Sequence, residues 1–154
     1  MVLNNVIRTF ICADAGWIDV MIPVAAPDVG SAVPLIEGMD SDGGWLTVLF
    51  SGVRRTSKPT MIPIEVNGTP WRGSANAFVS HGVDYVGSFS GLYSGRDYGL
   101  PGDVLDAVEA KYEYWRRECY FAALLAVGIQ APGRESSESI GVLNVNFVRE
   151  NRSE

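Results

Sequence analysis

Apolar residues recur along this chain in two different rhythms, one typical of helices and the other of strands. Near the amino terminus, Val2, Val6 and Phe10 follow one another at intervals of four residues. That spacing places the three side chains on one side of a helix. It predicts a short helix within residues 2–13.

The longest helical pattern covers residues 102–119. Its apolar positions form one stripe at intervals of three or four residues, made of Val104, Val108, Tyr112, Trp115 and Cys119. Asp103 suits the start of this helix, because a carboxylate accepts free backbone N–H groups and favours the positive end of the helix dipole. Glu113 and Arg117 lie four residues apart, so we expect them to pair on another face.

A second, shorter helix is expected over residues 74–82. Ser74 is of the residue type that commonly caps the start of a helix through its side chain. Gly82 is of the type that commonly ends one.

Runs of β-branched, aromatic and aliphatic residues predict the strands. They cover residues 17–24, 45–51, 120–129 and 140–148, with a further strand beginning at Asp84 and an extended segment over residues 60–66. The run over residues 120–129 is apolar on both faces, so we expect it to be covered on both sides. About nine polar residues join the last two strands, which favours an antiparallel pair.

These elements predict an α+β domain with a mostly antiparallel sheet of five to six strands and helices on both faces. No internal repeat and no linker divides the 154 residues, so we expect residues 1–154 to form a single domain. The chain is 47% hydrophobic and 19% charged, which is enough apolar material to fill a core.

The charge and hydropathy of the chain exclude several partners. The formal net charge is −6, and an acidic surface repels phosphate backbones, so we expect no nucleic-acid partner. The longest apolar run, residues 120–129, has half of the about twenty residues that a membrane-spanning helix needs. Residues 1–16 lack the apolar core of a signal sequence. We therefore expect a soluble, cytoplasmic protein without membrane contact.

Side chains for metal or nucleophilic chemistry are few. The chain has two cysteines, Cys12 and Cys119, and one histidine, His81. A zinc site needs three or four nitrogen or sulfur ligands, and a serine hydrolase needs a histidine between its nucleophile and its acid. We therefore predict no metal site and no catalytic residue, and we expect His81 to end a helix.

The remaining charged residues that stand near turns have structural interpretations. Asp84, Asp97 and Asp103 fit capping and turn positions. Arg72 and Arg96 are expected in solvent, with binding of an anionic group as the alternative.

Two stretches resemble a known family. The segment "YFAALLAVGIQAPGRESSESIGVLNVNFV" is similar to the last two strands of GAF domains, which are sensory domains of signal-transduction proteins. The segment "IPIEVNGTPWRGSANAFVSHGVDYV" is similar to the middle of that family, with Ala77, Phe78 and Gly82 at matching positions. The proline usual in the family's penultimate strand is Gly128 here.

The resemblance implies a small-molecule site between the sheet and the elements that cover it. Candidate ligand-binding residues there are Phe89, Tyr93, Tyr98, Tyr112, Trp115, Asn144 and Asn146. For Tyr112 and Trp115 the alternative is a role in the core. Asn144 and Asn146 alternate with apolar residues, so both amides point to one face. The alternative for them is bonding to each other, to water or to the backbone, because a buried amide needs a partner.

The function that the resemblance implies is a non-catalytic sensor, a regulatory domain that binds an unidentified small molecule or forms a homodimer. Its output domain would lie on the same or a partner chain, and the present chain would be excised from a longer protein or be a minimal version. The motifs of bilin-, haem- and cyclic-nucleotide-binding members are absent, so no cofactor is named. Alternatives are a protein–protein interaction module without a ligand and a thiol-based reductase that uses Cys119, alone or with Cys12.

Overall fold

The computed structural model describes residues 15–25, 32–52, 58–87, 98–118, 121–133 and 138–148. Its elements in chain order are β1 (Ala15–Val24), β2 (Val33–Pro34), β3 (Asp42–Ser51), β4 (Thr60–Val66), β5 (Thr69–Pro70), α2 (Ser74–Ser80), β6 (Val83–Val86), α3 (Gly102–Glu118), β7 (Phe121–Gln130) and β8 (Ser139–Val148).

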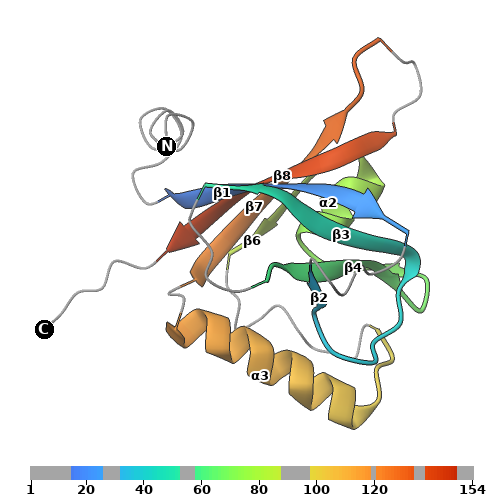
Figure 1. Ribbon diagram of the computed structural model, residues 1–154, viewed down its shortest axis with the longest axis vertical. Helices are drawn as coiled ribbons and strands as arrows, with labels where there is room; N and C mark the ends of the chain where they lie inside the picture. Colours follow the sequence, from blue (N-terminus) through green and yellow to red (C-terminus); the bar gives the residue numbers. More distant parts are fainter. Residues whose placement is uncertain are drawn as a thin grey trace, which may run out of the picture.

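All of these strands belong to one mixed sheet of eight strands (Figure 1). The order is β2-β4-β3-β1-β8-β7-β6, and β5 pairs with β4 beside this path. β2 runs parallel to β4, whereas the other pairs are antiparallel. The predicted sheet of five to six strands was therefore too small, because the short strands β2 and β5 and the extended segment β4 all join it.

The last strand of the described chain, β8, lies in the middle of the sheet. It is antiparallel to β1 on one edge and to β7 on the other. The predicted antiparallel pairing of the last two strands is confirmed. β8 is buried along the face that carries Val142, Asn144 and Asn146.

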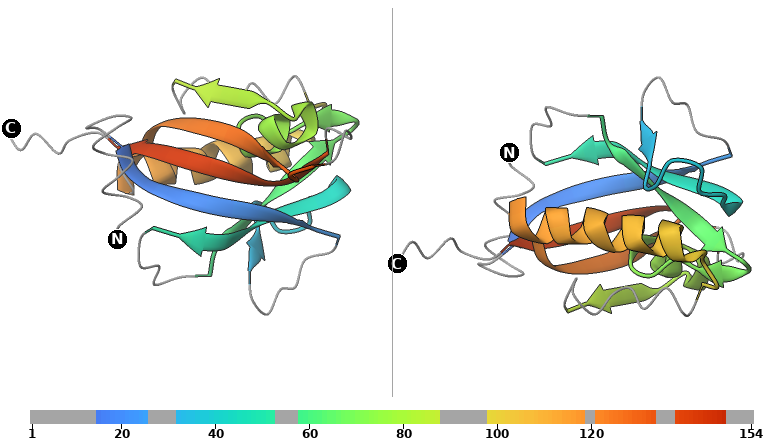
Figure 2. Two further views of the ribbon diagram at one scale, coloured as in Figure 1. Left: turned by 90° about the horizontal axis from the view of Figure 1, so that it is seen from above. Right: turned by 90° about the horizontal axis from the view of Figure 1, so that it is seen from below.

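Both described helices pack against the same face of the sheet, which we call the inner face. Val108 and Tyr112 of α3 and Ala77 of α2 belong to one buried cluster with Val142 of β8. Figure 2 shows α3 behind the strands in one view and in front of them in the opposite view. The expected arrangement, an α+β domain with helices on both faces, is therefore wrong for the described residues, which are mostly strand. The helix predicted within residues 2–13 lies outside them.

The opposite face of the sheet, the outer face, has a small cluster of its own around Ile18 and Val145. Three partly buried residues pack against these two: Leu125, Leu143 and Phe147. No described helix covers this face, and the prediction that β7 is covered on both sides stays a prediction. Neither α2 nor α3 is long and apolar enough to cross a membrane.

The ends of α2 differ from the sequence prediction. Ser74 is the first helical residue, and Gly73 occupies the capping position without a side-chain bond. The helix ends at Ser80, and His81 takes the left-handed conformation, with φ of 55°. The N–H groups of His81 and Gly82 donate to carbonyls of the last helical turn. The predicted cap by Ser74 is wrong because its hydroxyl faces the sheet and bonds there.

Gly128 of β7 marks the closest approach between the sheet and α2. A Cβ at this position would lie 2.7 Å from the carbonyl oxygen of Ala77 and 3.0 Å from Oγ of Ser139. The first of these is a backbone atom, which cannot rotate away. A residue with any side chain, including the proline usual in GAF domains, would push α2 off the sheet.

Substitution Gly128→Ala is expected to lower the free energy of unfolding by about 1–3 kcal/mol, because the added methyl group overlaps the Ala77 carbonyl. Urea unfolding followed by circular dichroism measures the change. Gly102→Ala is the control, since nothing lies within 4 Å of a Cβ there. Equal stability of the two variants would contradict the close approach.

Candidate functional site

Polar side chains cross the inner face of the sheet in one row. Directly opposed residues of neighbouring strands share a face, and the pairing here runs from Asp84 to Ala126, then to Asn144, Asp19 and Ser51. The row thus joins five strands from β6 to β3. We call it the polar row. A row beside it runs from Val86 through Leu124 and Asn146 to Trp17.

Asn144 is the centre of the polar row and is only 4% exposed. Its Oδ1 accepts a bond from Oγ of Ser74 at 3.1 Å, which ties the start of α2 to β8. Its Nδ2 donates to the thioether sulfur of Met21 at 3.1 Å. A thioether is a weak acceptor, so this amide N–H has a weaker partner than a carbonyl or carboxylate would provide.

Asp19 lies directly opposite Asn144 on β1 and is 5% exposed. Its Oδ2 accepts bonds from Nδ2 of Asn146 at 3.0 Å and from Nε1 of Trp17 at 3.1 Å. Asn146 is 4% exposed. The carboxylate of Asp19 and the amides of Asn144 and Asn146 are therefore all buried on the inner face of β1 and β8. Burial of such groups costs free energy unless they are hydrogen-bonded.

Asp84 supports α2 from the other end of the polar row. Its Oδ2 accepts the backbone N–H of Gly73 at 2.7 Å and Nδ2 of Asn76 at 3.1 Å. The carboxylate therefore does what a capping side chain does, but it comes from β6 instead of from the residue before the helix.

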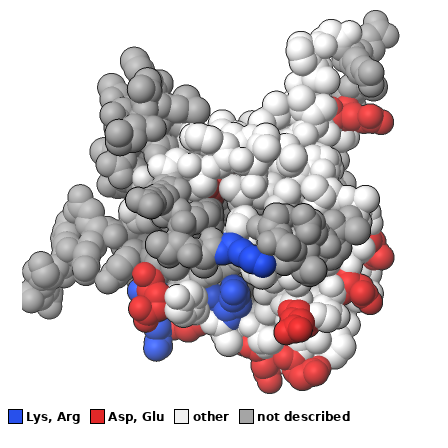
Figure 3. All heavy atoms as spheres, viewed as in Figure 1, with Lys and Arg blue, Asp and Glu red and all other residues white. Residues whose placement is uncertain are grey.

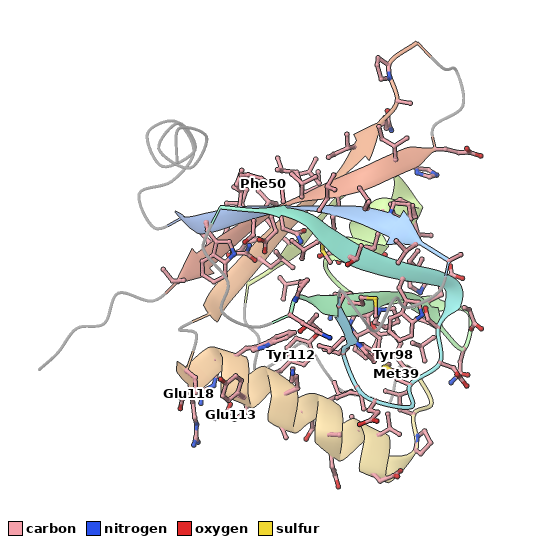
Figure 4. All side chains as sticks on the ribbon, viewed as in Figure 1. Met39, Phe50, Tyr98, Tyr112, Glu113 and Glu118 are labelled. Atoms are coloured by element: carbon pink, nitrogen blue, oxygen red, sulfur yellow. The ribbon has the colours of Figure 1, made fainter. Side chains whose placement is uncertain are left out.

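Four aromatic side chains form a continuous chain beside the polar row. The ring of Tyr98 lies against Trp71 with centroids 4.5 Å apart. Nε1 of Trp71 is 3.4 Å from the hydroxyl of Tyr112, and the ring of Tyr112 meets Trp115 edge-on at 4.9 Å. Trp71 has no exposed surface and contacts both Tyr98 and Tyr112. Figure 4 shows Tyr98 and Tyr112 between the sheet and α3, with Phe50 on the other side of the sheet.

Tyr98 also holds the turn before α2. Its hydroxyl accepts the backbone N–H of Arg72 at 3.0 Å, and its carbonyl oxygen accepts Nδ2 of Asn67 at 2.6 Å. These contacts tie Tyr98 to the turn before α2, and the ligand contact that the sequence predicts for it stays a prediction. Arg72 itself is exposed, as expected.

The solvent side of α3 carries the predicted ion pair. Nε of Arg117 lies 2.5 Å from Oε1 of Glu113, and Arg116 makes two bonds to the same carboxylate. The bonds from Arg116, then those from Arg117, outweigh desolvation and lower the pKa of Glu113 from 4.5 to about 2. Figure 3 shows the charged side chains gathered over α3, while much of the surface above it is uncharged.

His81 connects the end of α2 to the start of β8. Its Nδ1 accepts the backbone N–H of Ser139 at 3.1 Å and lies 3.0 Å from Oγ of the same residue. A ring nitrogen has one lone pair, and here the backbone N–H uses it. That arrangement suits a structural tie better than proton abstraction from Ser139.

The structure brings together only some of the residues that the sequence predicts for a ligand site. Asn144 bonds Ser74, and Asn146 bonds Asp19, which lies directly opposite Asn144 on β1. Tyr112 is buried and Trp115 half-buried in the aromatic chain, as the core alternative states. Other candidates, Phe89, Tyr93, Arg96, Asp97, Cys12 and Cys119, lie outside the described residues. Within the described part no three His, Cys, Asp or Glu side chains are placed to hold a metal ion.

Sequence reasoning missed Asp19, Trp17 and Ser74. The signal for Asp19 is its charge inside the apolar run "WIDVMIPV". Alternation places Asp19 on the same face of the strand as Trp17 and Met21. Ser74 offered no such signal, because a serine at a helix start normally suggests a cap.

Comparisons with known proteins do not assign this chain to a family. No family model matches it, no curated protein matches it, and no solved structure matches it. The site must therefore be interpreted from its own geometry.

Substitution Asp84→Ala is expected to lower the free energy of unfolding by about 1–3 kcal/mol, because it leaves the Gly73 N–H and the Asn76 amide without their acceptor. Urea unfolding gives the value. Asp84→Asn keeps one acceptor oxygen and is expected to lose less. An alanine variant as stable as the wild type would show that the carboxylate does not hold α2.

The carboxylate of Glu113 is expected to titrate with a pKa of about 2 in an NMR pH titration. Because this pKa lies below the usual 4.5, the stabilisation from the pair is complete above that value and is lost as the pH falls towards 2. Arg116→Ala should raise the pKa of Glu113 more than Arg117→Ala, since the bonds from Arg116 lower it most. Equal effects of the two variants would contradict this ranking.

Proposed function

We propose that this chain is a non-catalytic regulatory domain that binds a small molecule at the β1–β8 part of the polar row. The observation that carries the proposal is the group formed by Asp19, Asn144 and Asn146 on the inner face of two central strands. Apolar side chains at these positions would avoid the free-energy cost of burying polar groups. The resemblance to GAF domains supports the same regulatory role.

The hydrogen-bonding pattern favours a ligand that presents both donors and acceptors. The Asn144 amide now donates to a thioether, so a ligand oxygen would be a stronger acceptor for it. Small-molecule sites typically combine a few convergent polar groups with an apolar surround. Trp17 and Leu124 supply such a surround in the neighbouring row.

Native mass spectrometry of the purified full chain, compared with its denatured mass, tests the proposal. A non-covalent mass addition that disappears on denaturation is the expected result. A library of small polar compounds, screened by saturation-transfer NMR, extends the search to ligands that purification removes. Asn146→Leu should abolish the binding, because it removes the amide while keeping the number and branching of the side-chain heavy atoms.

Asn76→Ala is the matched control for this test. It removes another amide of the inner side, but one that lies on α2 and bonds Asp84. Binding that survives Asn76→Ala and is lost in Asn146→Leu supports the proposed site. Absence of any binder, or binding that Asn146→Leu leaves unchanged, would contradict it.

A second candidate is an interaction module that acts without a ligand. The specific observation in its favour is the outer face of the sheet, where Val83 and Tyr85 of β6 are exposed. The cytoplasmic setting and the output domain expected from the sequence stay predictions under either function.

A further inference from the structure

The outer face of the sheet is built from apolar cross-strand rows. One row runs from Tyr85 through Leu125 and Val145 to Ile18, and the next from Val83 through Val127, Leu143 and Val20 to Phe50. Neither row contains a charged residue. Each crosses at least four neighbouring strands, so the two rows together are continuous and uncharged, although their middle is buried.

Exposure along these rows increases from the middle of the sheet towards β6, and Phe50 at the β3 end of the second row is 45% exposed. Ile18 and Val145 in the middle of the sheet are 0% and 2% exposed. Val83 and Tyr85 at the edge are 62% and 61% exposed. Exposed apolar surface of this kind commonly marks an interaction site.

β6 is also an edge strand. It pairs with β7 on one side and is the end of the strand order in the described part of the chain. An edge strand presents backbone N–H and C=O groups that can pair with a strand of another molecule.

We propose that β6 pairs antiparallel with β6 of a second copy of this chain, about a two-fold axis. The whole chain carries a net charge of −6, so two copies repel each other except where their surfaces are uncharged. The outer rows at β6 provide such a surface. A two-fold axis brings the same strand of both copies together, and this edge is complementary to itself in both hydrogen bonding and apolarity.

The period of a strand restricts the register of this pairing. Opposed residues of antiparallel strands point to the same face, and a slip of one residue would bring the outer face of one copy against the inner face of the other. Only registers centred on a residue, Asp84 or Tyr85, therefore keep the two outer faces continuous.

Charge decides between these two registers. Centring on Asp84 would set two carboxylates directly opposite each other, which is destabilising. Centring on Tyr85 sets the two tyrosines opposite each other and places Asp84 opposite Val86 of the other copy. Val83 then lies opposite Gly87. The ring of Tyr85 of the same strand lies beside Gly87, since a Cβ at Gly87 would be 3.1 Å from it. The geometry points to the register centred on Tyr85.

Sedimentation equilibrium of the full chain tests the dimer. We expect a dimer, and we expect Tyr85→Glu to weaken it by about 30-fold or more, since it places two charges at the axis. Tyr114→Glu is the matched control, because Tyr114 is another exposed tyrosine but lies on α3. A monomer at every concentration, or a dimer that both substitutions weaken equally, would overturn the proposal.

Cross-linking tests the register and does not depend on the folding of the Tyr85→Glu variant. In a background with Cys12→Ser and Cys119→Ser, Tyr85→Cys should form a disulfide-linked dimer on mild oxidation. Directly opposed Cα atoms lie about 4.5–5.5 Å apart, within the range for a disulfide. Val83→Cys should not cross-link, because its two copies would be about 14 Å apart. Cross-linking at Val83 only, or at neither position, would overturn the proposed pairing.

Discussion

The pairing of β8 with strands on both of its edges is the constraint on which the rest of this structure depends. β8 joins β1, the first described strand, to β7, which precedes it directly. Because α2 and α3 pack on the inner face, the side chains that β8 directs to that face are buried. In β8 that face carries two asparagines next to Val142. The neighbouring elements therefore have to supply hydrogen-bond partners as well as apolar contacts.

Those partners explain how the helices and strands are fixed to one another. Ser74 at the start of α2 bonds Asn144, and Asp84 of β6 accepts the backbone N–H of Gly73. Asp19 of β1 accepts the amide of Asn146. Asn144 belongs both to the contacts that position α2 and to the proposed recognition site. A ligand there would act directly on the contacts between the central strands and α2, which is a physical route from binding to a change of shape.

The two faces of the sheet have different chemistry, and this asymmetry favours different partners. The inner face combines the polar row with the aromatic chain centred on Trp71, and it is covered by α2 and α3. The outer face has uncharged rows that are buried in the middle and exposed at β6 and at Phe50 of β3. In a chain with a net charge of −6, an uncharged part of the surface lets two copies meet without setting like charges against each other. The proposed ligand site on the inner face and the proposed pairing of β6 at the edge of the sheet involve different residues, so the two proposals can be tested separately.

The sequence by itself determined the elements whose cause is local. Alternation and helical spacing predicted most of the long strands and α3, and the spacing of Glu113 and Arg117 predicted their ion pair, because each pattern depends on residues a few positions apart. The sequence also placed Asn144 and Asn146 on one face.

Only the tertiary structure decided which residues meet across the chain. Asn146 bonds Asp19 from 127 positions away, and no periodicity encodes that contact. Ser74 has the local signature of a cap, yet its hydroxyl bonds β8 and the cap comes from Asp84. The need for glycine at position 128 likewise follows from the Ala77 carbonyl of α2. The packing of α2 on the sheet overrides the local preference, because buried polar groups take whichever partner the fold brings within reach.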